Sequence, residues 1–195
     1  MNELFALLLS MHVHTVTLSF DDGPDPRYTK QVLQILKDNH VQANFFLVGQ
    51  RMVDHPELVT RIVNEGHDIG GHSMTHKELT KIPLEQARWE ILQSMLMVNH
   101  YQKTNLFRFP YGDFNPSLVK IVHDHGYRNI FWKVDTLDWK YKDKNEIYTK
   151  FKVKIAHCPD GSIILMHDIH PQTVEFLRLA IPFLKANNIK IEKIK

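Results

Sequence analysis

The sequence contains little of what several protein classes require. Its 195 residues include one cysteine, Cys158, so intramolecular disulfides are excluded as the source of its stability. We interpret Cys158 as a small structural residue rather than a nucleophile, because no pattern of neighbouring bases surrounds it. Long runs of charge of one sign are also missing. Lys and Arg (24) and Asp and Glu (22) are interleaved and leave a net charge of +2, so nothing indicates nucleic-acid binding.

Long apolar runs are missing as well. The longest near the start, residues 4–9, is far shorter than the roughly 20 residues that span a bilayer. No Lys or Arg precedes it, unlike the basic segment that begins an export signal. We therefore expect residues 1–12 to form a tail or short helix and expect no membrane span. The cellular location stays open, with the cytoplasm as the default, and a monomer is the default oligomeric state.

The remainder of the chain has the composition of an ordinary globular domain, with 43% apolar and 24% charged residues. One domain over residues 13–195 is expected at this length. Strands are predicted over residues 13–20, 42–48, 67–70, 106–109, 130–134, 162–166 and 189–194. Helices are predicted over residues 28–39, 56–65, 83–102, 116–125, 144–157 and 173–187. This alternation predicts an α/β fold with about seven parallel strands, in either an open doubly wound sheet or a closed barrel.

Five polar clusters favour the barrel, because each follows the end of a predicted strand. They are Ser19–Gly23, His72–His76, Arg108–Tyr111, Asp135–Trp139 and Leu165–His167. In a (β/α) barrel the carboxyl ends of all strands meet at one rim, where the active site lies. In an open sheet the first and last strands would usually be too far apart to share one site.

The first two clusters suggest a metal centre. Asp21 and Asp22 are adjacent at a strand end and point different ways, so one carboxylate can bind a metal while the other faces a water molecule. His72 and His76 are four residues apart, which would place both rings on one face of a helical turn. Two imidazoles and one carboxylate leave positions open for water and substrate, as a catalytic zinc-type site requires.

The later clusters supply a fixed cation and a proton donor. Arg108 is suited to holding a carboxylate in one orientation. His167 follows an apolar strand and could protonate a departing amine. An imidazolium is best held by a neighbouring carboxylate, and Asp135 at the end of the preceding strand is the obvious candidate.

These five clusters, in this order, resemble the motifs of the polysaccharide deacetylase family, also called the NodB-homology or carbohydrate esterase 4 family. The resemblance extends from about Val13 to Ile194 and implies a distorted (β/α) barrel, with residues 13–195 as the catalytic domain. It implies that Asp21 is the catalytic base and that Arg108 holds its carboxylate. It further implies that one divalent metal ion, Zn²⁺ before Co²⁺ or Ni²⁺, is bound by Asp22, His72 and His76.

The resemblance also implies roles for the remaining polar clusters. Asp135 would pair with His167, the general acid. The backbone N–H of Tyr111 would help to stabilise the oxyanion. Trp139 and Leu165 would line the pocket that takes the acetyl methyl group.

Two positions depart from the family pattern without touching a proposed ligand. Asn44 stands where Thr is common, and Gly71 stands where Asn often precedes the first histidine. Both could alter the surroundings of the metal ligands.

The function implied is a metal-dependent hydrolase that removes N-acetyl groups from polysaccharides containing N-acetylglucosamine, such as peptidoglycan or chitooligosaccharides, and releases acetate. Three alternatives remain at this point. They are an O-acetyl esterase acting on xylan-type glycans, a hydrolase of small amides, and a non-catalytic carbohydrate-binding domain. The third is disfavoured because binding alone would need neither Asp21 nor His167.

Overall fold

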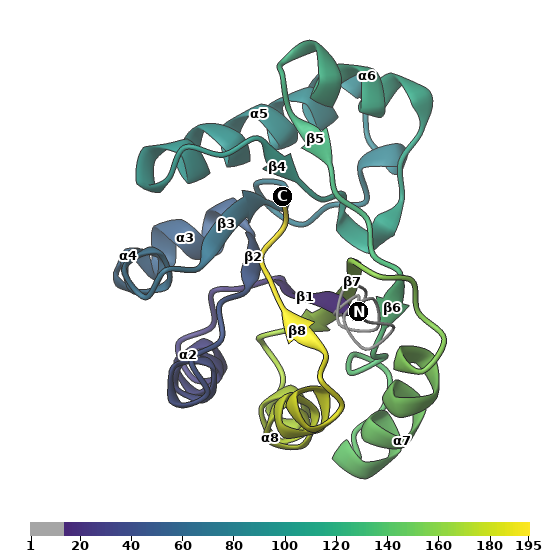
Figure 1. The fold of residues 1–195 in the computed structure, drawn as a ribbon. Helices are drawn as coiled ribbons and strands as arrows, with labels where there is room; N and C mark the ends of the chain where they lie inside the picture. The colour runs from purple at the N-terminus through teal and green to yellow at the C-terminus, as the bar shows by residue number, and fades with distance from the viewer. Residues whose placement is uncertain (1–13) are drawn as a thin grey trace, which may run out of the picture.

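One curled parallel sheet organises the chain, which the structure, a computed structural model, describes over residues 14–195 (Figure 1). The expected tail over residues 1–12 lies outside the described residues. The strands are β1 (Thr15–Asp21), β2 (Asn44–Leu47), β3 (Asp68–Gly71), β4 (Leu106–Phe107), β5 (Arg128–Asn129), β6 (Val134–Asp135), β7 (Ser162–His167) and β8 (Lys190–Ile191). Their order is β5-β4-β3-β2-β1-β7-β6, and β8 pairs with β1.

Helices lie around the outside of this sheet, as Figure 1 shows. They are α2 (Tyr28–Asp38), α3 (Gly49–Asp54), α4 (Pro56–Asn64), α5 (Leu84–Tyr101), α6 (Pro116–Asp124), α7 (Lys144–Ile155) and α8 (Pro171–Ala186), with short 3₁₀ turns η2 (Leu79–Lys81) and η3 (Pro110–Gly112). All of the recorded strand pairings are parallel, and the helices cover the convex side. The prediction of a distorted (β/α) barrel is therefore confirmed.

The barrel has a seam between β5 and β6, which are the two ends of the hydrogen-bonded path through the described strands. The prediction of one strand over residues 130–134 is wrong, because this segment crosses the seam. The Ile130 N–H donates to Phe107 O on one side (2.8 Å), and the Lys133 N–H donates to Ile163 O on the other (3.0 Å). The polypeptide itself therefore joins the two edges.

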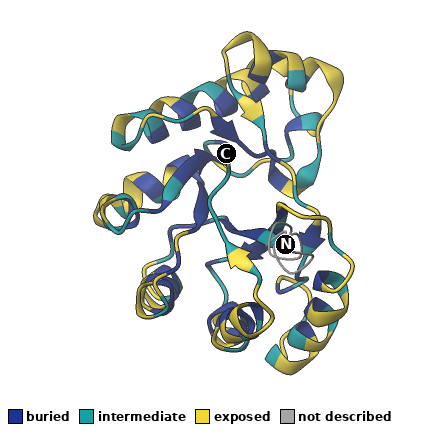
Figure 2. Cartoon of the chain, viewed as in Figure 1, coloured by how far each residue is buried: buried dark blue, intermediate teal, exposed yellow. Residues whose placement is uncertain are grey.

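The core lies between the sheet and its helices. Figure 2 shows most of the strands and the inward helix faces buried, β5 and β8 partly exposed, and the outer helix faces exposed. Val16, Leu18 and Phe20 on β1 are among the most buried apolar side chains. On β3, a Cβ at Gly71 would lie 2.7 Å from Met95 Sδ on α5, so the helix packs too closely there for a larger residue.

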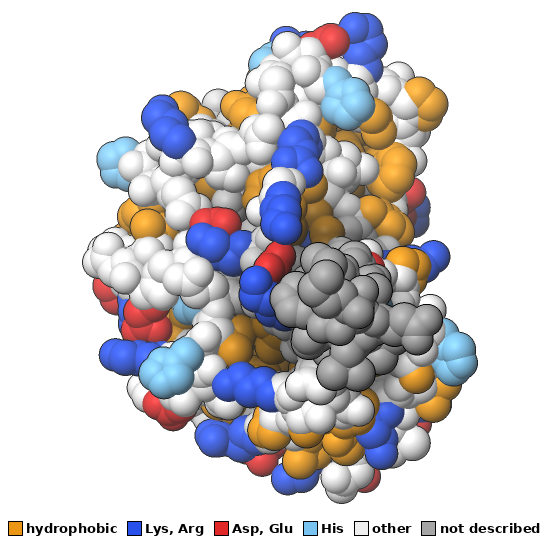
Figure 3. Space-filling view, in the orientation of Figure 1, with side chains coloured by type: hydrophobic (Ala, Val, Ile, Leu, Met, Phe, Trp, Pro, Cys, Tyr) orange, Lys and Arg blue, Asp and Glu red, His pale blue; other side chains and the backbone are white. Residues whose placement is uncertain are grey.

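The C-terminal segment crosses the end of the barrel opposite to the predicted site. The Ile194 N–H donates to Asn44 Oδ1 (3.0 Å), and the Arg128 guanidinium donates twice to Lys195 O (3.0 Å each). Lys193 Nζ lies 2.8 Å from Asp68 Oδ1. Figure 3 shows Lys and Arg side chains gathered along the middle of this face. No helix among residues 14–195 combines the length and apolar character needed to cross a membrane.

Candidate active site

One pocket at the carboxyl ends of the strands brings the predicted residues together. Its volume is about 290 Å³, and it is lined by Asp21, Asp22, His72, His76, Tyr111, Trp132, Asp135, Trp139, Leu165 and His167. Every site residue predicted from the sequence lies on this wall except Arg108, which is fully buried behind Asp21. Trp132 was not predicted, because nothing in its sequence context distinguishes it from a core aromatic residue.

Three side chains of this pocket converge as metal ligands would. Asp22 Oδ1 lies 3.3 Å from His72 Nε2 and 2.9 Å from His76 Nε2. One ligand atom from each residue lies within 4.8 Å of the other two. Asp22 Oδ1 is buried and accepts no hydrogen bond within the described protein. A buried carboxylate oxygen without a donor, facing two imidazole nitrogens, fits a shared divalent cation.

The charge state of Asp22 agrees with this role. Burial by itself raises the pKa of the Asp22 carboxyl, but the His72 and His76 imidazoles together outweigh burial and hold that pKa well below its usual range. The carboxylate is therefore ionised at neutral pH. It can bind a cation without first losing a proton.

The loop after β3, not a helical turn, positions the two histidines. Ser73 and His76 both have positive φ angles, of 60° and 59°. Ser73 Oγ accepts the His76 N–H at 2.9 Å. The buried Glu90 on α5 accepts the N–H groups of Met74 and Thr75, at 2.9 and 2.7 Å. The helical interpretation of the four-residue spacing was wrong, since side-chain hydrogen bonds hold a tight loop that no periodicity reveals.

Hydrogen bonding also fixes which ring nitrogen of His72 can bind a metal. His72 Nδ1 lies 2.8 Å from the backbone oxygen of Arg108. Because a carbonyl oxygen can only accept, Nδ1 carries the proton and donates it there. Nε2 faces Asp22, and in the neutral ring it carries the lone pair that a metal ion would take, which is the arrangement seen for metal-binding histidines.

Arg108 anchors the first aspartate of the pair. Its Nη1 donates to Asp21 Oδ1 at 2.6 Å and to Ser19 Oγ at 2.9 Å. Its Nε donates at 3.2 Å to the backbone oxygen of Ile130, where the segment that crosses the seam begins, and its guanidinium carbon lies 3.9 Å from the Phe46 ring centroid. Burial lowers the pKa of Arg108 and Asp21 opposes this, but a guanidinium stays charged in proteins. Asp21 is therefore paired, buried and fixed in orientation.

The partner of His167 is Asp138, and the prediction of Asp135 was wrong. His167 Nδ1 donates to Asp138 Oδ1 at 2.8 Å, and the His167 N–H donates to Asp138 Oδ2 at 2.7 Å. Leu137, with φ of 62°, turns the loop so that Asp138 points inward and is fully buried. Asp135 instead accepts the Leu137 N–H at 2.7 Å. Two aspartates three residues apart after a strand look alike in the sequence, and only the turn distinguishes them.

This pairing keeps His167 protonated. Burial by itself lowers the pKa of the imidazole, but the hydrogen bond and charge of Asp138 outweigh burial and raise it to about 9. Thr173 Oγ1 donates to the same carboxylate at 2.6 Å and holds it in place. At neutral pH His167 therefore carries a proton that it can donate.

The predicted substrate-contacting residues line the pocket, with Tyr111 and Trp139 exposed and Leu165 buried. Tyr111, 65% exposed and with φ of 61°, lies against His76 with ring centroids 4.7 Å apart. Trp139 is half-exposed, whereas Leu165 is buried at the pocket floor. Trp132 completes the apolar wall. A polar centre beside a small apolar recess suits an acetyl group attached to a larger molecule.

Known proteins resemble this chain in sequence and in fold. The polysaccharide deacetylase family model matches residues 10–130. A peptidoglycan-N-acetylglucosamine deacetylase of Listeria monocytogenes is 36% identical over 183 residues, which are 92% of this chain but 38% of that protein. The chain thus spans about two fifths of that relative.

Solved structures share the fold. A family 4 carbohydrate esterase from Streptomyces lividans, solved with acetate, has a TM-score of 0.85 and 28% identity over 93% of both chains. A family 4 pseudoenzyme from Bacillus anthracis has a TM-score of 0.86 and 29% identity over 94% of this chain and 64% of that one. Sequence match, fold and the converging polar residues together show that this chain belongs to the polysaccharide deacetylase family.

Proposed function

We propose that this protein is a metal-dependent hydrolase that removes N-acetyl groups from polysaccharides containing N-acetylglucosamine and releases acetate. The observation that carries this proposal is the convergence of Asp22, His72 and His76 within 4.8 Å, beside the pocket that also holds Asp21 and His167. A binding domain would need no carboxylate fixed by a buried arginine and no protonated histidine facing it.

The three ligand residues would hold one divalent ion, with Zn²⁺ expected before Co²⁺ or Ni²⁺. Two imidazole nitrogens and a carboxylate oxygen are the donor set of many catalytic zinc sites, which keep a coordination position open. When bound, such an ion supplies polarisation of the acetyl carbonyl and lowers the pKa of a nearby water.

The residues around this centre provide the proton transfers. Asp21, held by Arg108, accepts a proton from the water that attacks the acetyl carbonyl carbon. The backbone N–H of Tyr111 is expected to donate to the oxyanion that develops. His167, kept protonated by Asp138, donates its proton to the sugar nitrogen as the C–N bond breaks, and acetate and a free amine result. Leu165 and Trp139 would receive the acetyl methyl group.

The choice of an N-acetyl substrate is supported by the named activity of the Listeria relative and by the protonated His167. An amine is a poor leaving group and requires a proton, whereas an O-acetyl ester depends less on an acid.

The test is acetate release from acetylated chitooligosaccharides, peptidoglycan glycan strands and acetylated xylan, with and without a chelator. We expect release from the N-acetylated glycans, loss on chelation and recovery on adding Zn²⁺, Co²⁺ or Ni²⁺. Replacing Asp21→Asn should abolish turnover while bound metal, measured by elemental analysis, persists. Acetate release from xylan alone would favour the esterase alternative. Full activity of the chelated protein would contradict the metal-dependent proposal.

A further inference from the structure

A second concave surface lies beside the active-site pocket and shares side chains with it. This cleft has a volume of about 490 Å³, within the range of roughly 300–1,000 Å³ usual for ligand sites. Its lining includes Phe131, Trp132, Lys133, Asp135, Lys154 and His157. Trp132 and Asp135 also line the active-site pocket. The two concave surfaces therefore meet at Trp132 and Asp135.

The aromatic side of the cleft is exposed but fixed in orientation. Phe131 is 49% exposed and stacks on Trp132, with ring centroids 4.3 Å apart and planes at 11°. The Phe114 ring packs edge-on against Phe131 at 6.1 Å. Large apolar side chains held at the surface beside a pocket commonly mark a contact site, and aromatic rings can pack against the C–H face of a sugar.

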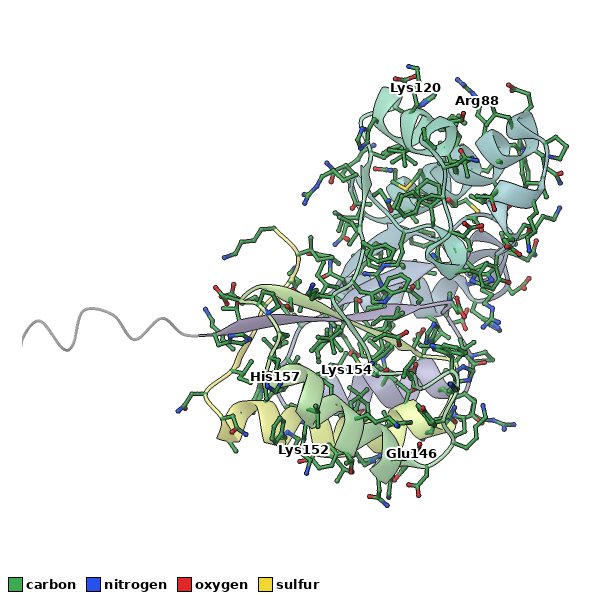
Figure 4. The ribbon with its side chains drawn as sticks, turned by 90° about the vertical axis from the view of Figure 1, so that its right-hand side faces the viewer. Arg88, Lys120, Glu146, Lys152, Lys154 and His157 are labelled. Atoms are coloured by element: carbon green, nitrogen blue, oxygen red, sulfur yellow. The ribbon has the colours of Figure 1, made fainter. Side chains whose placement is uncertain are left out.

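The cleft also carries positive charge that forms no ion pair with a described acid. Lys133 is exposed and forms no ion pair with any residue from 14 to 195. Lys154 Nζ donates to the backbone oxygen of Asp135 at 2.6 Å and likewise forms no ion pair among those residues. In Figure 4, Lys154 and His157 lie along the edge of α7 nearest to the strands, whereas Lys152 lies lower on the helix. The one acid of the cleft is Asp135, so the side chains there carry two ammonium groups against one carboxylate.

We propose that this cleft binds the sugar next to the reacting N-acetylglucosamine, and that it selects a sugar bearing a carboxylate. The sugar ring packs against Phe131, and its carboxylate pairs with Lys133 and Lys154. This inference rests on the proposed function, because it assigns the deacetylated sugar to the neighbouring pocket. It makes an anionic glycan, such as one carrying lactyl ether groups, a better substrate than a neutral chitooligosaccharide of equal length.

The test compares two tetrasaccharides without peptides. One is all N-acetylglucosamine, and the other alternates N-acetylglucosamine with its 3-O-lactyl derivative. We expect Lys133→Gln to raise KM for the lactyl tetramer about fivefold, the effect of losing an exposed ion pair of about 1 kcal/mol, and to leave KM for the neutral tetramer unchanged. Lys120→Gln is the matched control, because Lys120 lies on α6 and pairs with Asp124 at 2.8 Å. It should change neither KM.

Equal KM changes for both tetramers, or no change for either, would overturn the assignment of the cleft while acetate release still supports the proposed function. If the wild-type protein releases acetate from neither tetramer, the proposed function fails, and calorimetric binding of the lactyl tetramer decides the cleft separately. Binding about fivefold weaker in Lys133→Gln would support the cleft, and equal binding would overturn it.

Discussion

Replacing Asp138→Asn tests the pairing that sets the acid of the proposed reaction. The buried carboxylate raises the pKa of His167 from an ordinary 6.5 to about 9. Asparagine is nearly isosteric but uncharged, so the pKa of His167 should fall back toward its ordinary value, since burial is then opposed only by the charges of Asp22 and Asp21. The variant would hold little imidazolium at pH 8, where the wild-type protein holds mostly imidazolium.

The size of the effect follows from the two pKa values. The difference between 6.5 and about 9 corresponds to about 3 kcal/mol of interaction between the imidazolium and its surroundings, at 1.36 kcal/mol per pKa unit. Thr173 Oγ1 and the His167 N–H also lose a charged acceptor. We therefore expect a fall in kcat of at least tenfold at pH 8, and a smaller fall at pH 6.

The assay is the pH dependence of kcat/KM for acetate release, with Asp135→Asn as the matched control three residues away. For the wild-type protein the alkaline fall should lie near pH 9. In Asp138→Asn it should move by at least one pH unit toward acid, whereas Asp135→Asn should keep the wild-type position. An unmoved alkaline fall in Asp138→Asn, or a shift in Asp135→Asn alone, would refute the assignment of Asp138.

The unfolding free energy should also depend on the His167–Asp138 pair. Because the folded pKa of His167 is raised, its contribution is complete below about pH 6.5 and is lost as the pH rises through about 9. Burial raises the pKa of the folded Asp138 carboxyl, but the hydrogen bonds and charge of His167 and the hydrogen bond of Thr173 outweigh burial and lower it below 3.8. The contribution of Asp138 to the unfolding free energy is therefore lost as the pH falls below 3.8. The difference in unfolding free energy between wild type and Asp138→Asn should therefore be largest between about pH 4 and 6.5, measured by denaturant titration.

Other predictions concern the metal ligands, the buried arginine and the close packing of β3. His72→Ala and His76→Ala should both lose stoichiometric metal, and retention of metal in both variants would contradict the ligand set. His72→Ala should also lower the melting temperature, because the backbone oxygen of Arg108 loses its hydrogen-bond donor. Arg108→Met should lower the unfolding free energy by about 3–5 kcal/mol, since Asp21 is left buried without its cation, and unchanged chemical denaturation would contradict this. Gly70→Ala should cost about 1–3 kcal/mol, because a Cβ there would lie 2.8 Å from the backbone oxygen of Leu106, and a wild-type melting temperature would argue against such tight packing.

Much of the fold could be predicted because the chain alternates clear strand and helix patterns. The long apolar stretches of β1, β2 and β7 and the amphipathic helices appear in the sequence at nearly their observed positions. The seam could not be predicted, because residues 130–134 have a strand's composition. Whether such a segment pairs within the sheet or bridges its edges depends on which strands lie beside it. The short helix α3 escaped notice because it begins at Gly49 and has only 6 residues.

Site residues at the end of a strand could be predicted from the sequence, whereas a residue whose position depends on a loop turn could not. Asp21 and Asp22 lie at a strand end, so their convergence with the loops after β3 and β4 follows from the barrel itself. Asp135 and Asp138 are separated by the backbone turn at Leu137, and the contacts that hold Asp138 come from His167 and Thr173, which are distant in sequence. Trp132 lies in the segment that crosses the seam, so its place in the pocket wall could not be predicted from the sequence either.

The connections of Arg108 make three parts of the molecule thermodynamically interdependent. Its side chain holds Asp21, the proposed base, its backbone oxygen accepts from Nδ1 of His72, a proposed metal ligand, and its Nε donates to the segment that closes the barrel. Substitutions at Asp21, His72 and Arg108 should therefore deviate from additivity in double-mutant cycles. A substitution that changes the proton affinity of Asp21 would also change the affinity for the proposed metal ion and the packing at the barrel seam. Evolution of the proposed activity would therefore have to alter these positions jointly rather than one at a time.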